Sequence, residues 1–275
     1  MSYRTDIAYS YDGSLEGLMT CVFEIFEKKE RPSAVFSPNE AQTVLYEIRE
    51  IYTDHTKARR VLSSIAEKLG EEAMYLVKMT YYSDAEEKEI KVLDFLRHVY
   101  STGAKAVSQL SHPSVFPVHA AARITSNEAA LYNEFVRFSE YSGLLVSVIE
   151  PKAFVLPLII DHFRDRLPSE SFLIYDKTHK YALLYNKSRH EIAPMDSLEL
   201  PQTDDEEQKY AALWQMFYNT IAVEGRTNHI CRMNHMPKRF WSHMTEFQQD
   251  SPKLTSPAKL SSLDKPDSIY LPGEK

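Results

Sequence analysis

The segment from Glu134 to Tyr185 constrains the fold of this chain more than any other. Two pairs of strand-like runs, FVRFSEY with LLVSVIE and SFLIYD with YALLYN, flank the turn signals Ser142-Gly143 and KTHK. Between the pairs lies the amphipathic run FVLPLIIDHFRDRL, whose Pro157 fits only the first turn or two of a helix. The segment therefore predicts hairpin, helix and hairpin, and hence a four-stranded, mainly antiparallel sheet.

Helical periodicity dominates the rest of the chain. Near the N-terminus, DIAYSY at 6–11 alternates like a strand, a helix follows a cap at Asp12 or Ser14, and SAVF at 33–36 completes a β-α-β unit. Further helices are predicted over 55–69, 71–82, 86–102 and about 115–132, with Gly70 and Gly103 as C-caps. We therefore expect a helix-rich α+β fold, with a mainly antiparallel sheet built from the N-terminal β-α-β unit and the two later hairpins.

The pattern divides the chain into three regions. Residues 1–125 hold the β-α-β unit and a helical region, and 126–247 hold the hairpins and a C-terminal helix. In that helix, a stripe at helical spacing is formed by Leu213, Met216, Phe217, Thr220 and Ile221. Residues 248–275 are rich in Pro, Ser and Lys, which predicts a flexible tail.

Composition excludes several classes of protein. The sequence has two cysteines, Cys21 and Cys231, and no signal-like N-terminal run, so we expect a cytoplasmic protein without a disulfide framework. No apolar run approaches the roughly 20 residues that span a bilayer, so no membrane insertion is expected. The seven glycines match neither a Walker loop nor a dinucleotide fingerprint, and no cofactor is expected.

Positive charge is concentrated locally, although the net charge is −7. The run GRTNHICRMNHMPKRFW contains no carboxylate and carries Arg226, Arg232, Lys238 and Arg239. Such a strip can contact phosphates even in an acidic protein. We predict that these four cations form one nucleic-acid-binding surface.

A second cluster of cations lies in the middle of the chain. Arg137, His162, Arg164 and Arg166, with Tyr175 and Asp176 beside them, would line a groove that grips phosphates. A structural interpretation is also open. The cations of DHFRDR would face the negative end of their helix dipole, and Arg137 would pair with Asp161, Asp165 or Asp176.

Metal binding and catalysis have weaker signals. The spacing of His229, Cys231, His235 and His243 matches no common zinc site, so no metal is expected. Carboxylate pairs at helical spacing, Asp161 with Asp165 and Asp12 with Glu16, could hold a divalent ion. An enzyme that uses Asp12, Asp161 or His162 therefore stays an alternative.

Several motifs resemble a bacterial family of DNA-metabolism proteins, the DUF4130 family. They are YSYDGSLEGLMTCVFEIFEKKE, FVRF with HFRDR and LIYD, and MPKRFW with TEF, and the resemblance spans roughly residues 3–247. The resemblance implies an association with a radical-SAM protein of DNA modification or repair. In that family the domain also occurs fused to uracil-DNA glycosylase-type domains. The resemblance carries no catalytic residues.

These observations together predict a partner in DNA metabolism. Two cysteines cannot supply the thiolates of an iron–sulfur cluster, so a radical-SAM cluster would belong to the partner. We expect a protein that binds nucleic acid or presents DNA to that enzyme. The alternatives are a DNA-acting enzyme in its own right, such as a nuclease, glycosylase or base-modifying enzyme, and an interaction scaffold.

Overall fold

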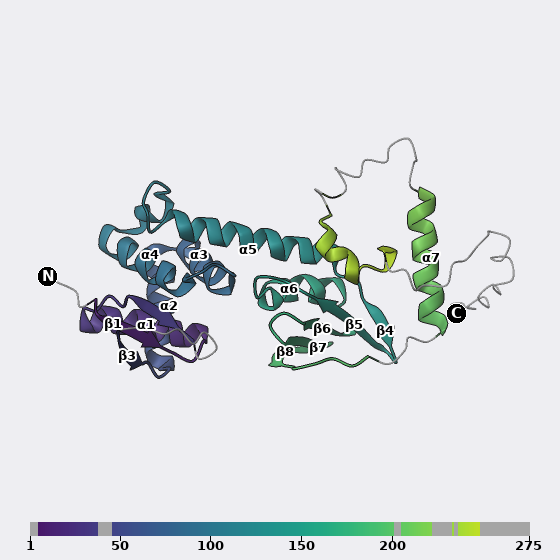
Figure 1. The fold of residues 1–275 in the computed structure, drawn as a ribbon, viewed down its shortest axis with the longest axis horizontal. Helices are drawn as coiled ribbons and strands as arrows, with labels where there is room; N and C mark the ends of the chain where they lie inside the picture. The colour runs from purple at the N-terminus through teal and green to yellow at the C-terminus, as the bar shows by residue number, and fades with distance from the viewer. Residues whose placement is uncertain (1–4, 38–45, 201–204, 222–232, 234–235, 248–275) are drawn as a thin grey trace, which may run out of the picture. The chain divides into compact units, whose positions relative to one another are not determined.

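The computed structural model describes residues 5–37, 46–200, 205–221, 233 and 236–247. The chain divides into two compact units, whose helices and strands are labelled in Figure 1. The first comprises residues 1–134 with 150–166, and the second comprises 135–149 with 167–275. The predicted tail at 248–275 lies outside the described residues.

The first unit contains a parallel three-stranded sheet. Strand β1 (Ile7–Ser10) lies between β2 (Ala34–Phe36) and β3 (Glu47–Glu50). Helix α1 (Leu15–Lys28) connects β1 to β2, and the Ser14 hydroxyl accepts the Gly17 N–H at its N-terminus. The predicted β-α-β unit and cap are confirmed. The expectation that this unit joins a mainly antiparallel sheet is wrong, because all its pairings are parallel and it forms a sheet of its own.

Helices make up the rest of the first unit. They are α2 (His55–Leu69), α3 (Glu71–Tyr82), α4 (Lys88–Thr102), α5 (Phe116–Phe135) and α6 (Leu156–Arg166), with the 3-10 helix η1 (Ala104–Ser108). Gly70 and Gly103 end α2 and α4 with positive φ angles of 91° and 101°, which confirms the predicted C-caps. Pro157 is the second residue of α6, where a missing N–H costs nothing.

The core of the first unit lies between β1, α1, α2 and α4. Ile7, Leu18, Ile65, Phe95 and Leu96 are completely buried there. The start of α6 is tied to the same unit because the buried Glu128 carboxylate on α5 accepts the N–H groups of Lys152 and Ala153.

The second unit contains a five-stranded sheet in the order β4-β5-β6-β7-β8. The strands are β4 (Ser139–Tyr141), β5 (Leu144–Ile149), β6 (Ser171–Asp176), β7 (Tyr181–Asn186) and β8 (Arg189–Pro194). Both predicted hairpins are present, and Ser142 and Gly143 have the positive φ angles of a tight hairpin turn. The sheet is mainly antiparallel as expected, but β5 and β6 are parallel and β8 was not predicted.

The C-terminal part of the second unit is helical. Helix α7 (Asp205–Ile221), which was predicted, packs on the 3-10 helix η4 (Thr245–Phe247), which follows the 3-10 helix η3 (Lys238–His243). The Gln215 side-chain amide donates to the Thr245 carbonyl at 2.7 Å. We call α7, η3 and η4 the C-terminal module. Within the described ranges, no helix is both long and apolar enough to cross a bilayer.

Candidate nucleic-acid interface

Arg137 holds the C-terminal module to the segment that precedes β4. Its Nη2 lies 3.0 Å from Oε1 of Glu246, whose side chain is 2% exposed, and Trp214 Nε1 donates to Oε2 of the same carboxylate at 3.3 Å. Arg137 belongs to the strand-like run FVRFSEY, but β4 begins only at Ser139. The direction of the Arg137 side chain is therefore not determined by the alternation of side chains along a strand. Its acidic partner is Glu246 and not one of the expected aspartates. These contacts give Arg137 a structural role.

The cations of α6 lie on the surface of the first unit. Arg164 contacts Asp161 at 3.1 Å and Asp165 at 3.8 Å, which is the pairing of neighbours on a helix surface. His162 and Arg166 are exposed, and the His162 ring is edge-on to Phe163. Because α6 and Arg137 belong to different units, the groove proposed for them stays a prediction.

The basic strip is described in part. Arg226 and Arg232 lie outside the described residues, whereas Lys238 and Arg239 are exposed on η3. Lys238 Nζ lies 5.9 Å from the centre of the Trp241 ring, and the Arg239 guanidinium lies 4.9 Å from that of Phe240. The two described cations are therefore presented on aromatic rings.

Helix α7 carries an exposed aromatic stripe that the sequence interpretation missed. Tyr210, Trp214 and Phe217 are 62%, 42% and 53% exposed and occupy positions i, i+4 and i+7, which share one helix face. The rings of Trp214 and Phe217 lie 5.8 Å apart at 31°. Their spacing is a usable signal, but Phe217 also fits the apolar stripe predicted with Leu213 and Met216.

Stacked rings connect the cations of η3 to α7. Trp241 stacks on Phe247 of η4 with centroids 4.6 Å apart, and Phe247 meets Tyr218 of α7 edge-on at 5.5 Å. The exposed cations and the aromatic stripe therefore belong to one packed module.

The carboxylates considered for catalysis have structural partners. Asp12 accepts hydrogen bonds from Ser14 N, Ser14 Oγ and Thr53 Oγ1. Partial burial pushes the pKa of Asp12 upward, but the hydrogen bonds from Thr53 and Ser14 outweigh it and leave the pKa lowered. Asp161 and Asp165 are exposed beside Arg164.

Metal ligands do not gather in the described part of the chain, where no three His, Cys, Asp or Glu side chains are placed to hold an ion. Of the four His and Cys residues weighed for zinc, His229, Cys231 and His235 lie outside that part and His243 lies inside it.

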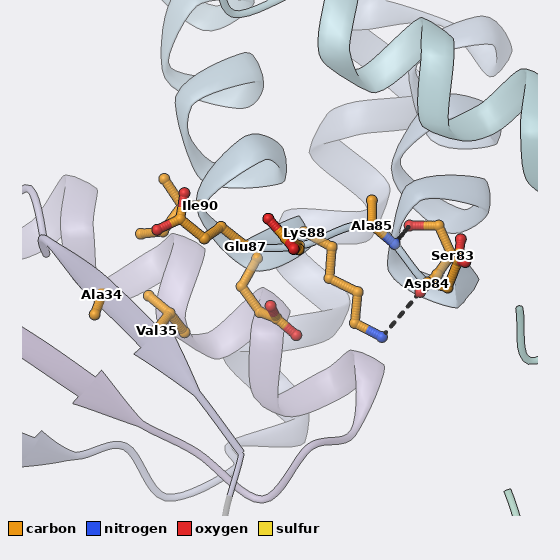
Figure 2. Close-up of a pocket in the computed structure, with 10 residues that line it drawn as sticks. Ala34, Val35, Ser83, Asp84, Ala85, Glu87, Lys88 and Ile90 are labelled. Atoms are coloured by element: carbon orange, nitrogen blue, oxygen red, sulfur yellow. Dashed lines mark hydrogen bonds between the residues drawn. The ribbon is translucent and has the colours of Figure 1, made fainter. Parts of the chain in front are cut away.

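A cavity of about 640 Å³ in the first unit is acidic. Figure 2 shows Glu87 and Asp84 around it, together with Lys88, whose Nζ donates to the Ser83 carbonyl at 3.3 Å. Glu86 and Glu89 line it as well. One lysine among four carboxylates does not suit phosphate, so this cavity is not a candidate for nucleic acid.

The buried Asp176 pairs with the half-buried His179 in the turn between β6 and β7. Asp176 is completely buried, and its Oδ2 lies 2.6 Å from His179 Nδ1. Its Oδ1 accepts the N–H groups of Thr178 and His179. A carboxylate that orients an imidazole is typical of general bases, but the same contacts also stabilise the turn.

Comparison with known proteins gives one family. No curated protein and no solved structure matches the chain. A family described as a domain of unknown function, DUF4130, matches residues 86–246, which run from the segment just before α4 into η4. The match begins after β1, β2 and β3 and covers α7, η3 and the first two residues of η4. The chain belongs to the DUF4130 family.

Proposed function

We propose that this protein binds single-stranded DNA through its C-terminal module and presents it to a radical-SAM enzyme of DNA modification or repair. The observation that carries the proposal is the exposed stripe of Tyr210, Trp214 and Phe217 in the same module as the exposed cations Lys238 and Arg239.

Exposed aromatic rings on one helix face favour unpaired bases. Each base stacked on an aromatic side chain contributes about 1–3 kcal/mol, whatever its identity. Bases in a duplex are already stacked on each other, so their faces are not accessible to α7. The module should therefore prefer single strands to duplex DNA.

The cations of η3 supply the contacts to phosphates. Lys238 and Arg239 are exposed, and the aromatic rings beneath them reduce the freedom of their side chains. The acidic cavity opposes phosphate binding at its own site, and the net charge of −7 opposes indiscriminate coating of the protein by DNA. We therefore expect the C-terminal module to make few phosphate contacts.

The radical-SAM partner is supported by the sequence resemblance and by the cysteine count. Co-purification of the two proteins at micromolar concentration tests it, with and without DNA. A stoichiometric complex supports the presenting role, whereas failure to associate in both conditions contradicts it.

Binding to labelled single-stranded and duplex oligonucleotides tests the DNA proposal. Tyr210→Ala/Phe217→Ala should weaken single-strand binding at least about tenfold, because two stacking platforms are lost. Tyr52→Ala/Tyr75→Ala is the matched control, since both tyrosines are exposed in the first unit. Equal losses in the two variants, or tighter binding of duplex, would contradict the proposal.

The Asp176–His179 pair favours one alternative, a base-acting enzyme. Incubation of the protein with a labelled oligonucleotide, followed by alkali and gel analysis, reveals strand cleavage or base loss. Activity in the wild type that disappears in His179→Asn would support catalysis. Intact DNA in both reactions would contradict catalysis by this pair and leave DNA binding as the proposed function.

A further inference from the structure

A groove in the first unit lies between α1, α2 and the end of α4. It has a volume of about 660 Å³, within the range of roughly 300–1,000 Å³ that holds small ligands. Its apolar wall comes from Phe23 and Phe26 on α1 and from Tyr100 on α4. Phe26 is 39% exposed, and its ring meets Tyr100 edge-on at 5.5 Å. A flat ligand can therefore reach an aromatic ring.

Helix α2 supplies a row of polar side chains along this groove. Arg60, Ser64 and Lys68 occupy positions i, i+4 and i+8 and therefore share one helix face. With a rise of 1.5 Å per residue, the two cations lie about 12 Å apart along the helix. The row places a positive charge at each end and a hydroxyl between them.

The charges of the groove favour an anion. Its one acidic lining residue, Glu27, lies 3.6 Å from Lys57 Nζ, which also contacts Glu24 at 2.6 Å. Arg60 lies 5.6 Å from the centre of the Phe23 ring, and no described carboxylate lies within ion-pair distance of Arg60 or Lys68. The positive charge of the row is therefore not neutralised by the described residues.

We propose that this groove binds a nucleotide, with its base against Phe26 and its phosphates on Arg60 and Lys68. Cations suit phosphate, and an exposed phenyl ring in the same groove suits a heterocyclic base. The site is separate from the C-terminal module and does not depend on its proposed function. The nucleotide is either free or part of a single strand.

Isothermal titration calorimetry distinguishes a free nucleotide from part of a single strand, with ATP as one probe and a short oligo(dT) as the other. Arg60→Ala/Lys68→Ala should weaken binding of the true ligand at least about tenfold, and so should Phe26→Ala. Arg59→Ala/Lys78→Ala removes the same charge from exposed positions outside the groove and should change nothing. Thermal melts of every variant check the fold.

Each result decides the proposal. If ATP binding depends on Arg60 and Lys68, the groove holds a free nucleotide. If only oligo(dT) binding depends on them, the groove holds part of a DNA strand. Lys238→Ala/Arg239→Ala should leave ATP binding intact. A loss of DNA binding by the C-terminal module can therefore be told apart from a loss of ATP binding by the groove. The proposal is overturned if neither probe depends on the groove, if tripolyphosphate competes as well as ATP, or if an acidic amphipathic peptide binds instead.

Discussion

The guanidinium of Arg137 lies 3.0 Å from the carboxylate of Glu246, although 109 residues separate them in the chain. The other carboxylate oxygen accepts the Trp214 indole N–H. One buried carboxylate thus joins the segment before β4 to α7 and η4. Together with the ring contact between Phe135 and Phe240, this contact holds the C-terminal module in the second unit.

Arg137→Ala should destabilise the second unit by roughly 3 kcal/mol, because it leaves a buried carboxylate without its cation. Urea unfolding followed by tryptophan fluorescence measures this directly, since Trp214 and Trp241 are the two tryptophans of the chain and both lie in the C-terminal module.

Arg189→Ala is the matched control, because it removes an exposed arginine from β8 of the same unit and should cost less than about 1 kcal/mol. Adding Glu246→Gln to Arg137→Ala should recover part of the loss. An Arg137→Ala protein that unfolds like the wild type would return Arg137 to the list of phosphate contacts.

Gly17→Ala should destabilise the first unit by about 1–3 kcal/mol. A Cβ at Gly17 would lie 2.2 Å from Asp12 Oδ1, which accepts hydrogen bonds from Ser14, while Thr53 holds the other oxygen of the same carboxylate. Helix propensity alone predicts the opposite, a gain of about 0.5–1 kcal/mol. Thermal melts followed by circular dichroism decide between them, with the exposed Glu67→Ala as a control that stays within about 0.5 kcal/mol.

Glu30 should make the first unit sensitive to acid. Burial pushes the pKa of Glu30 upward, but hydrogen bonds from Tyr9 and Arg49 outweigh it and leave the pKa below its ordinary value of 4.5. A lowered folded pKa contributes stability that is complete above the unfolded pKa of 4.5 and is lost as the pH falls through the folded value.

The stability advantage of the wild type over Glu30→Gln should therefore shrink as the pH falls from about 6 to about 3. Melting temperatures of both proteins across that range measure it. An advantage that stays constant with pH would show that the Tyr9–Glu30–Arg49 contacts do not perturb the carboxyl.

Local signals predicted the helices and turns of this fold well. Gly70, Gly103, Pro157 and the Ser142-Gly143 pair determine where elements begin, end or reverse, and each acts through its own backbone geometry. Strand pairing is not local. The connection through α6 makes β5 and β6 parallel neighbours, and no local pattern shows that β1, β2 and β3 form a separate sheet.

The missed strands lie at sheet edges. EIRE in β3 and RHEIAP in β8 are mostly exposed, so they lack the alternation of apolar and polar residues that marks a half-buried strand. Their pairing comes from backbone hydrogen bonds to a neighbour, which the sequence does not display.

The candidate site was predictable in part. The composition of the basic strip was visible, and so was the spacing of Tyr210, Trp214 and Phe217. Which face of α7 is buried was not visible, because Leu213 and Met216 form a competing apolar row on the same helix. The partner of Arg137 could not be found either, since several nearby aspartates were equally plausible.

The salt dependence of single-strand binding tests the central claim most directly. For a labelled oligo(dT), the slope of log affinity against log salt is about −0.7 for each phosphate contacted. Lys238→Ala/Arg239→Ala should weaken binding and reduce the magnitude of that slope by roughly 1.4, the sum for two contacts. Arg59→Ala/Lys78→Ala should keep the wild-type slope. Wild-type affinity and slope in Lys238→Ala/Arg239→Ala would contradict nucleic-acid binding by the C-terminal module.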